Sequence, residues 1–253
     1  MKRHLGVSDI VARISSGSEC RPICSIPGCG RPTALAAAQG LAAFHCRYHV
    51  QYKARHGSHW HPTYTANELQ PYRDAADIWI ASQLQNATVR AALGAIDGLI
   101  STNARVEPAH NLNGLAAAER AWIALKRLGK AGVPPRRLLA TSMGLWALIE
   151  DDAGSHRTSE FREVQIAKAW HRLASGTHKT PSGFPLPPKY PNSSGLVLRI
   201  IGKKATSVCG GLARTHQTDV CEIKVDRFGV HPSHLPNWKA PLWRVPPRLR
   251  PNE

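Results

Sequence analysis

Residues 24–57 have the sequence CSIPGCGRPTALAAAQGLAAFHCRYHVQYKARHG and contain four potential metal ligands in two close pairs. Cys24 and Cys29 form the first pair and enclose a Pro-Gly dipeptide, which favours a tight turn. Cys46 and His49 form the second pair, and their three-residue offset places both side chains on one face of a helical turn. Zinc takes tetrahedral sets of thiolate and imidazole ligands. The stretch therefore predicts a closed, structural Cys3His zinc site.

Two alternatives to this ligand set stay open from the sequence. The four residues can be unrelated buried or exposed side chains, and Cys20 can replace one of the proposed ligands because it lies close before Cys24. With the other three cysteines assigned to metal, Cys20, Cys209 and Cys221 are an odd and scattered set. Such a set does not suit a disulfide framework, so we predict a reducing, cytoplasmic compartment.

Further residues extend the motif beyond the ligands. The positions that matter are Cys24, Cys29, Gly30, Arg31, Pro32, Gly40, Leu41, Cys46, His49, Arg55, His56 and Gly57. In this order they resemble a small zinc module of phage and other mobile-element proteins, often found beside an HNH or endonuclease VII-like nuclease. The arm over 33–44 is long and Ala-rich, and Val50 stands where that family usually has an aromatic residue. The resemblance implies a zinc site and a protein of a phage or other mobile element. It does not extend to nuclease activity, because we find no HNH motif elsewhere in the chain.

The charge of the chain predicts a polyanionic partner. Lys and Arg number 33 against 17 Asp and Glu, which gives a net charge of +16. Residues 1–64 carry eight basic and two acidic side chains (+6), and residues 227–253 carry five and one (+4). Phosphate neutralisation releases counterions, so nucleic acid, and DNA rather than RNA, is the expected partner. The predicted phosphate contacts are Arg31, Arg47, Lys53 and Arg55. No membrane partner is predicted, because the chain lacks a long apolar run and a strongly basic amphipathic helix.

Beyond the zinc module the chain is predicted to be mainly α-helical. Amphipathic patterns predict helices from Asn67, over 88–100 and 115–128, from Pro135 to Glu150, from Thr158 or Ser159, and over 194–212. The residues Asp219–Phe228 are the strand candidate, and Trp79, Trp122, Trp146 and Trp170 are predicted core anchors. The predicted division is a zinc-binding basic module over 1–64, a helical bundle over 65–175, a linker over 176–193, a helix and strand over 194–228, and an extended Pro-rich basic tail over 229–253.

Catalytic motifs are weak in this sequence. The segment Glu107–Asn111 has the acid, imidazole and amide that a metal-dependent nuclease uses, but a polar loop between helices is the simpler explanation. The acidic residues at 150–152 and the histidines at 56–61 are interpreted as a solvated turn and a solvated loop. We therefore predict a zinc-containing nucleic-acid-binding protein rather than an enzyme. The alternatives are a metal-dependent nuclease and an assembly component that binds a protein partner through the helical bundle.

Overall fold

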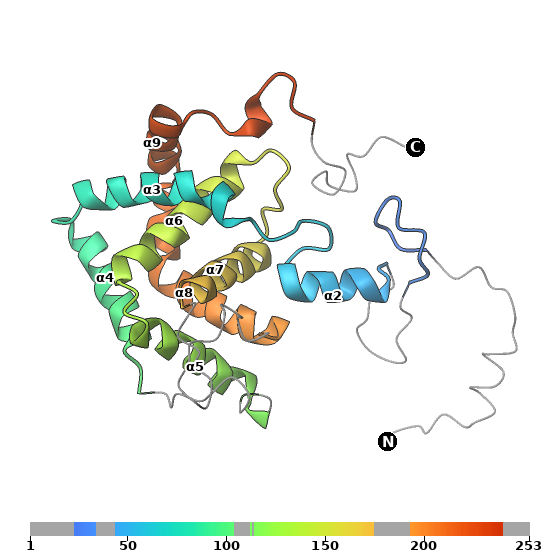
Figure 1. Cartoon of the computed structure of the whole chain (residues 1–253), viewed down its shortest axis with the longest axis horizontal. Helices are drawn as coiled ribbons and strands as arrows, with labels where there is room; N and C mark the ends of the chain where they lie inside the picture. The colour runs from blue at the N-terminus through green and yellow to red at the C-terminus, as the bar shows by residue number, and fades with distance from the viewer. Residues whose placement is uncertain (1–22, 34–43, 104–111, 113, 175–192, 240–253) are drawn as a thin grey trace, which may run out of the picture. The chain divides into compact units, whose positions relative to one another are not determined.

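The computed structural model is mainly α-helical, as the sequence predicts (Figure 1). It describes residues 23–33, 44–103, 112, 114–174 and 193–239. Over these residues the chain forms eight α-helices and no strand: α2 (Arg47–His56), α3 (Ala66–Ser82), α4 (Ala87–Ile100), α5 (Ala117–Lys130), α6 (Pro135–Asp151), α7 (Ser159–Leu173), α8 (Gly195–Thr215) and α9 (Gln217–Phe228). The chain divides into two compact units, Met1–Gln51 and Tyr52–Glu253, and the division falls within α2.

Helix α6 is the centre of the larger unit and packs against α3, α4, α7, α8 and α9 (Figure 1). Every residue from Leu138 to Ile149 is buried, as expected for a helix that is apolar on all sides. Its hydroxyl groups bond within the helix, because Thr141 donates to the Arg137 carbonyl at 2.7 Å and Ser142 donates to the Leu138 carbonyl at 3.1 Å. Burial of these polar groups is therefore compensated.

Two glycines allow the helices of this unit to approach closely. A Cβ at Gly144 of α6 would lie 2.7 Å from the backbone nitrogen of Arg73 in α3. A Cβ at Gly202 of α8 would lie 2.2 Å from the carbonyl oxygen of Glu163 in α7. Both neighbours are backbone atoms that cannot rotate away, so the absence of a side chain sets the spacing of these helix pairs.

The tryptophans take the core positions that the sequence predicts. Trp79, Trp146 and Trp170 are buried, and Trp122 is half-buried against the same core. The fully buried Trp170 donates its indole N–H toward α6, 3.0 Å from the Ser142 hydroxyl. A buried indole needs such a partner, so this contact fixes the orientation of α7 against α6.

The predicted strand over Asp219–Phe228 is wrong, because these residues lie in α9. The buried positions of the helix are Val220 and Lys224, four residues apart. Because one of the two buried positions is a lysine, the apolar residues alone do not show helical spacing. They resemble the alternating pattern of a strand instead. Helix α9 ends at Gly229, whose φ of 80° interrupts helical geometry.

Helix α3 begins before the predicted cap. Thr65 caps the helix instead of Asn67 and forms a capping box with Glu68, in which each side chain accepts from the other residue's backbone N–H. Thr158 caps α7 as expected. No helix in the described part of the chain combines the length and apolar character needed to cross a bilayer.

The described part of the Pro-rich tail lies against the end of α6. A short 3-10 turn, η2 (Pro232–His234), follows α9, and the Ser233 hydroxyl accepts from the Ala153 N–H at 3.3 Å. His234 Nε2 lies 2.7 Å from Asp151 Oδ1. The tail arginines and Trp243, which we expected to be extended, lie outside the described residues.

Candidate metal centre

Cys24 and Cys29 lie on a short loop that backbone hydrogen bonds shape. The Cys24 N–H donates to the Arg31 carbonyl at 2.8 Å, and the Cys29 N–H donates to the Ile26 carbonyl at 3.1 Å. The second bond closes a β-turn around the Pro-Gly dipeptide, whose glycine has a φ of 71°. Proline before a glycine of positive φ is the pattern of a type II turn, so this dipeptide brings the two thiols together.

Cys46 and His49 are placed by the first turn of α2. The Cys46 carbonyl accepts from the Val50 N–H at 3.1 Å, so Cys46 stands at the start of the helix. Burial raises the pKa of the Cys46 thiol, but hydrogen bonds from the His49 backbone and the Cys29 side chain outweigh it, and the net shift is downward. The helix N-terminus thus favours a thiolate at Cys46. For the Cys29 thiol, burial raises the pKa.

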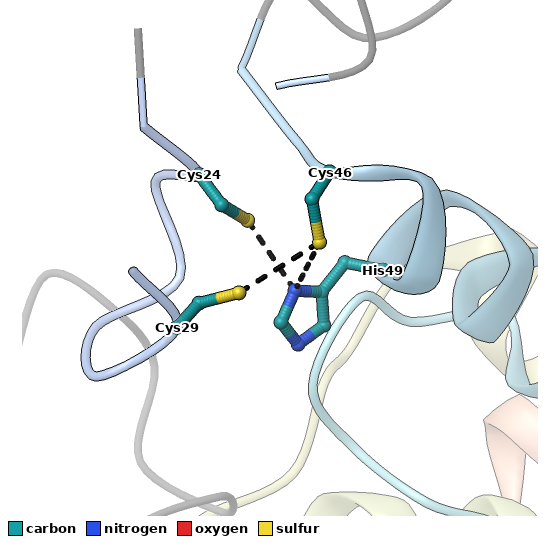
Figure 2. Close-up of side chains that lie close together, drawn as sticks. All are labelled: Cys24, Cys29, Cys46 and His49. Carbon is teal, nitrogen blue, oxygen red and sulfur yellow. Dashed lines mark hydrogen bonds between the residues drawn. The ribbon is translucent and has the colours of Figure 1, made fainter. Parts of the chain in front are cut away.

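The ligand atoms of the four residues point toward one another (Figure 2). All four lie within 4.8 Å of one another. Cys29 Sγ is 3.7 Å from Cys46 Sγ, and His49 Nδ1 is 3.3 Å from Cys24 Sγ and 3.4 Å from Cys46 Sγ. A tetrahedral metal with bonds of about 2.3 Å to sulfur and 2.0–2.1 Å to nitrogen separates two sulfurs by about 3.8 Å and sulfur from nitrogen by about 3.6 Å. The observed distances between the ligand atoms are close to these tetrahedral separations, so the group can hold a metal ion.

The centre is closed by a very small apolar cluster. Among the described residues this cluster consists of the buried Cys24, Ile26 and Cys46, with Cys29 packed against it. The loop is also tied to the segment before α2, where the Phe44 carbonyl accepts from the Ser25 N–H at 2.8 Å. So few buried groups provide little hydrophobic stabilisation, and small folds of this kind are usually held by a metal.

This is the one cluster of three or more metal-ligating groups within the described ranges. The structure brings together all four ligands that the sequence predicts, Cys24, Cys29, Cys46 and His49. The substitute ligand Cys20 and the acid-imidazole segment 107–111 lie outside the described residues. Cys209 is buried in the helical core, and Cys221 is half-buried.

The four predicted phosphate contacts differ in their surroundings. Arg31 and Arg47 are exposed, and the Arg31 guanidinium lies 4.9 Å from the centre of the Tyr48 ring. Arg55 is also exposed, whereas the Lys53 ammonium pairs with Glu160 at 3.2 Å. Lys53 is thus already neutralised in part within its own unit.

The acidic residues at 150–152 do not form the solvated turn that we expected. Asp152 is fully buried and accepts a hydrogen bond from the Tyr64 hydroxyl at 3.0 Å. Asp151 accepts a short hydrogen bond from the Tyr72 hydroxyl. Burial raises the pKa of Asp151, but the bonds from Tyr72 and His234 outweigh it and lower the pKa overall. Asp151 and Asp152, at the end of α6, thus each accept a hydrogen bond from a different tyrosine.

The histidine-rich segment also differs from the predicted solvated loop. His61 is fully buried, with its Nε2 3.7 Å from Asp152 Oδ2. His56 is half-buried, and its pKa is lowered to about 4 by burial and by the nearby charges of Lys168 and Arg55. The contact of Lys168 with His56 is not evident from the sequence, because the residues around a lysine on the amphipathic helix α7 do not indicate which distant residues it meets.

Comparisons of the whole chain with known proteins give no match. No family model, curated protein or solved structure matches it. The resemblance to the mobile-element zinc module therefore rests on the motif in residues 24–57 alone.

Proposed function

We propose that the Cys3His group binds zinc and that this protein binds nucleic acid, with DNA as the expected partner. The donor set supports zinc, because three thiolates and one imidazole suit its tetrahedral preference. Four protein ligands leave no open coordination position, so the metal's role is structural. Zinc bound there supplies folding free energy to a unit with few buried apolar groups.

The observation that carries the nucleic-acid proposal is the exposed pair of Arg31 and Tyr48 beside the metal group. The Tyr48 side chain is half exposed, and a cation–π contact at 4.9 Å orients the arginine over its ring. Arg47 directly precedes Tyr48 in the chain, and the exposed Phe44 lies four residues before Tyr48. Guanidinium groups contact phosphates, and aromatic faces stack on bases, so together they suit nucleic acid.

The charge of the chain supports the same partner. A net charge of +16 favours association with phosphates at low salt. We assign the contacts beside the metal group to Arg31 and Arg47, and a further contact to Arg55, because Lys53 pairs with Glu160. We also propose that the protein belongs to a phage or another mobile element, and only the motif in residues 24–57 supports this origin.

DNA binding measured across a salt series tests the proposal. We expect wild-type protein to bind a labelled duplex at about 50 mM salt and to lose most of its affinity by about 200 mM. Arg31→Gln should weaken binding more than Arg90→Gln, a matched control at an exposed position of α4. A wild-type protein that ignores DNA at low salt but binds a protein partner without salt dependence would replace this proposal with the assembly component.

The zinc part is tested separately by ligand replacement. Cys46→Ala should remove zinc and reduce DNA binding, whereas Cys221→Ala, at a half-buried cysteine outside the cluster, should retain both. If Cys46→Ala keeps full DNA affinity after losing zinc, the metal group has no part in binding.

A further inference from the structure

The unit Met1–Gln51 exposes large apolar side chains beside the metal group. Phe44 is 71% exposed, the highest value among the large apolar side chains in the described part of the chain. Ile23 is 67% exposed, and Tyr48 is half exposed. The backbone of Phe44 is nevertheless held in place, because its carbonyl accepts from the Ser25 N–H at 2.8 Å. Several exposed apolar side chains in so small a unit indicate a contact surface.

Arg31 and Phe44 are bonded to neighbouring residues of the same loop. The Arg31 carbonyl accepts from the Cys24 N–H, and the Phe44 carbonyl accepts from the N–H of the next residue, Ser25, each at 2.8 Å. The Arg31 guanidinium also lies 4.9 Å from the centre of the Tyr48 ring. A cation and two exposed aromatic residues are therefore held around one short loop.

The side chains around this loop carry positive charge. Residues 20–67 contain no Asp or Glu, so no carboxylate of this stretch neutralises Arg31 or Arg47. Both arginines are exposed. A partner that suits them together with Phe44 offers negative charge and a flat apolar face at the same place. Every nucleotide of a nucleic-acid strand has both, in its phosphate and its base.

Duplex and single-stranded DNA differ in what they offer to a phenylalanine. In a duplex the base faces are covered by stacked neighbours, and proteins contact mainly phosphates and the hydrogen-bonding groups at the base edges. A phenyl ring has no charge and no hydrogen-bonding group for such contacts. In a single strand the bases expose π-faces on which aromatic side chains stack. The exposed ring of Phe44 therefore suits an unpaired base.

We propose that the unit Met1–Gln51 binds single-stranded DNA, with an unpaired base stacked on Phe44 and the neighbouring phosphates bound by Arg31 and Arg47. This inference rests on the proposed function and names the form of DNA that the same site takes. The hydrogen bond from Ser25 fixes the backbone of Phe44, so part of the ordering cost of binding is already met in the free protein.

The test measures affinity by fluorescence anisotropy for three labelled probes of equal length: an oligothymidylate strand, an abasic strand and a duplex. The abasic strand retains the phosphates and lacks the bases. At about 200 mM salt, where phosphate contacts are weak, we expect the wild type to bind oligothymidylate more tightly than the other two probes. Phe44→Ala should weaken oligothymidylate binding about 5- to 150-fold, which corresponds to about 1–3 kcal/mol per stacked base. It should leave the other two affinities unchanged.

Three more variants show which property of the ring is used. Phe228→Ala is the matched control, because Phe228 is about half exposed at the end of α9 in the other unit, and it should leave all three affinities unchanged. Phe44→Leu keeps an apolar side chain without a π-face, so it should bind as Phe44→Ala does. Phe44→Tyr keeps the aromatic face and should bind as the wild type does.

The outcomes separate this inference from the proposed function. If the wild type binds none of the three probes at about 50 mM salt, the proposed function fails and the inference fails with it. If the duplex binds as tightly as oligothymidylate, or if Phe44→Ala weakens all three probes equally, only the single-strand contact is overturned. Full affinity of Phe44→Leu would also overturn it, because stacking needs the aromatic face.

A second measurement keeps the test valid if Phe44→Ala misfolds. The chain has four phenylalanines, so the ring signals of wild-type protein with labelled phenylalanine can be followed by NMR, and the Phe44 signal is the one lost in Phe44→Tyr. A base stacked on the ring shifts its proton signals upfield. The Phe44 signal should therefore move with oligothymidylate and stay in place with the abasic strand. An unchanged Phe44 signal in the protein bound to oligothymidylate would overturn the proposal.

Discussion

Replacing Gly144 by alanine should destabilise the helical unit through a clash that cannot be relieved by rotation. The added Cβ would lie 2.7 Å from the Arg73 nitrogen and 2.9 Å from both the Arg73 Cα and the Tyr72 carbonyl carbon. All three are backbone atoms of α3, so α3 and α6 must separate. Overpacking of this kind costs about 1–3 kcal/mol, and the exchange of glycine for alanine in a helix returns about 1 kcal/mol. We expect a net loss of about 0–2 kcal/mol relative to wild type.

Gly94→Ala is the matched control for this prediction. Gly94 is exposed in α4, and its added Cβ would meet no atom within 4 Å. Alanine here gains the same helix propensity without any overpacking cost, so Gly94→Ala should be more stable than wild type by about 1 kcal/mol. The difference between the two variants isolates the overpacking cost, about 1–3 kcal/mol.

Urea unfolding followed by tryptophan fluorescence measures both variants. All seven tryptophans lie at or after Trp60, so the signal reports the unit Tyr52–Glu253. Equal stability of Gly144→Ala and Gly94→Ala would refute the close packing of α3 against α6.

Three further predictions use the same unfolding assay. Tyr64→Phe removes the hydrogen bond to the buried Asp152 side chain and should cost about 1–3 kcal/mol, because a buried acceptor loses its donor; a loss under about 0.5 kcal/mol would contradict a buried hydrogen bond at this position. Gly57→Ala should cost about 2–4 kcal/mol, because φ is 77° and the added Cβ meets the α7 backbone at 2.8 Å, and a neutral effect would disprove that contact. The pKa values of His56 and His156 are lowered from 6.5 to about 4, mainly by burial, so the unfolded chain binds these protons first and stability should fall as pH drops from about 6.5 to 4. The double His→Gln variant should flatten that fall, and an unchanged slope would argue against the burial of these rings.

The sequence predicts the metal ligands and the helices where the decisive signal is local. The pairs Cys24 with Cys29 and Cys46 with His49 are each set by one turn, so their spacing alone indicates the site. Helix α6 has a long run of mostly apolar residues behind a Pro-Pro start, and these two local features together indicate a buried helix.

Contacts between distant segments explain what the sequence does not reveal. Asp152 is buried and accepts a hydrogen bond from Tyr64, 88 positions away, so the sequence alone does not reveal that this acid is shielded from solvent. Lys168 reaches Thr63 across 105 positions, and nothing in the pattern of α7 distinguishes it from an ordinary surface lysine. In α9 a buried Lys224 breaks the apolar period and leads to a false strand.

X-ray absorption at the zinc edge, combined with elemental analysis of the purified protein, tests the central claim most directly. The Cys3His site predicts one zinc per chain, with three sulfur neighbours at about 2.3 Å and one nitrogen at about 2.0 Å. In His49→Ala a water oxygen should replace the nitrogen neighbour, or the zinc should be lost. A protein that contains no zinc, or whose zinc has a shell of oxygen and nitrogen without sulfur, would contradict the account.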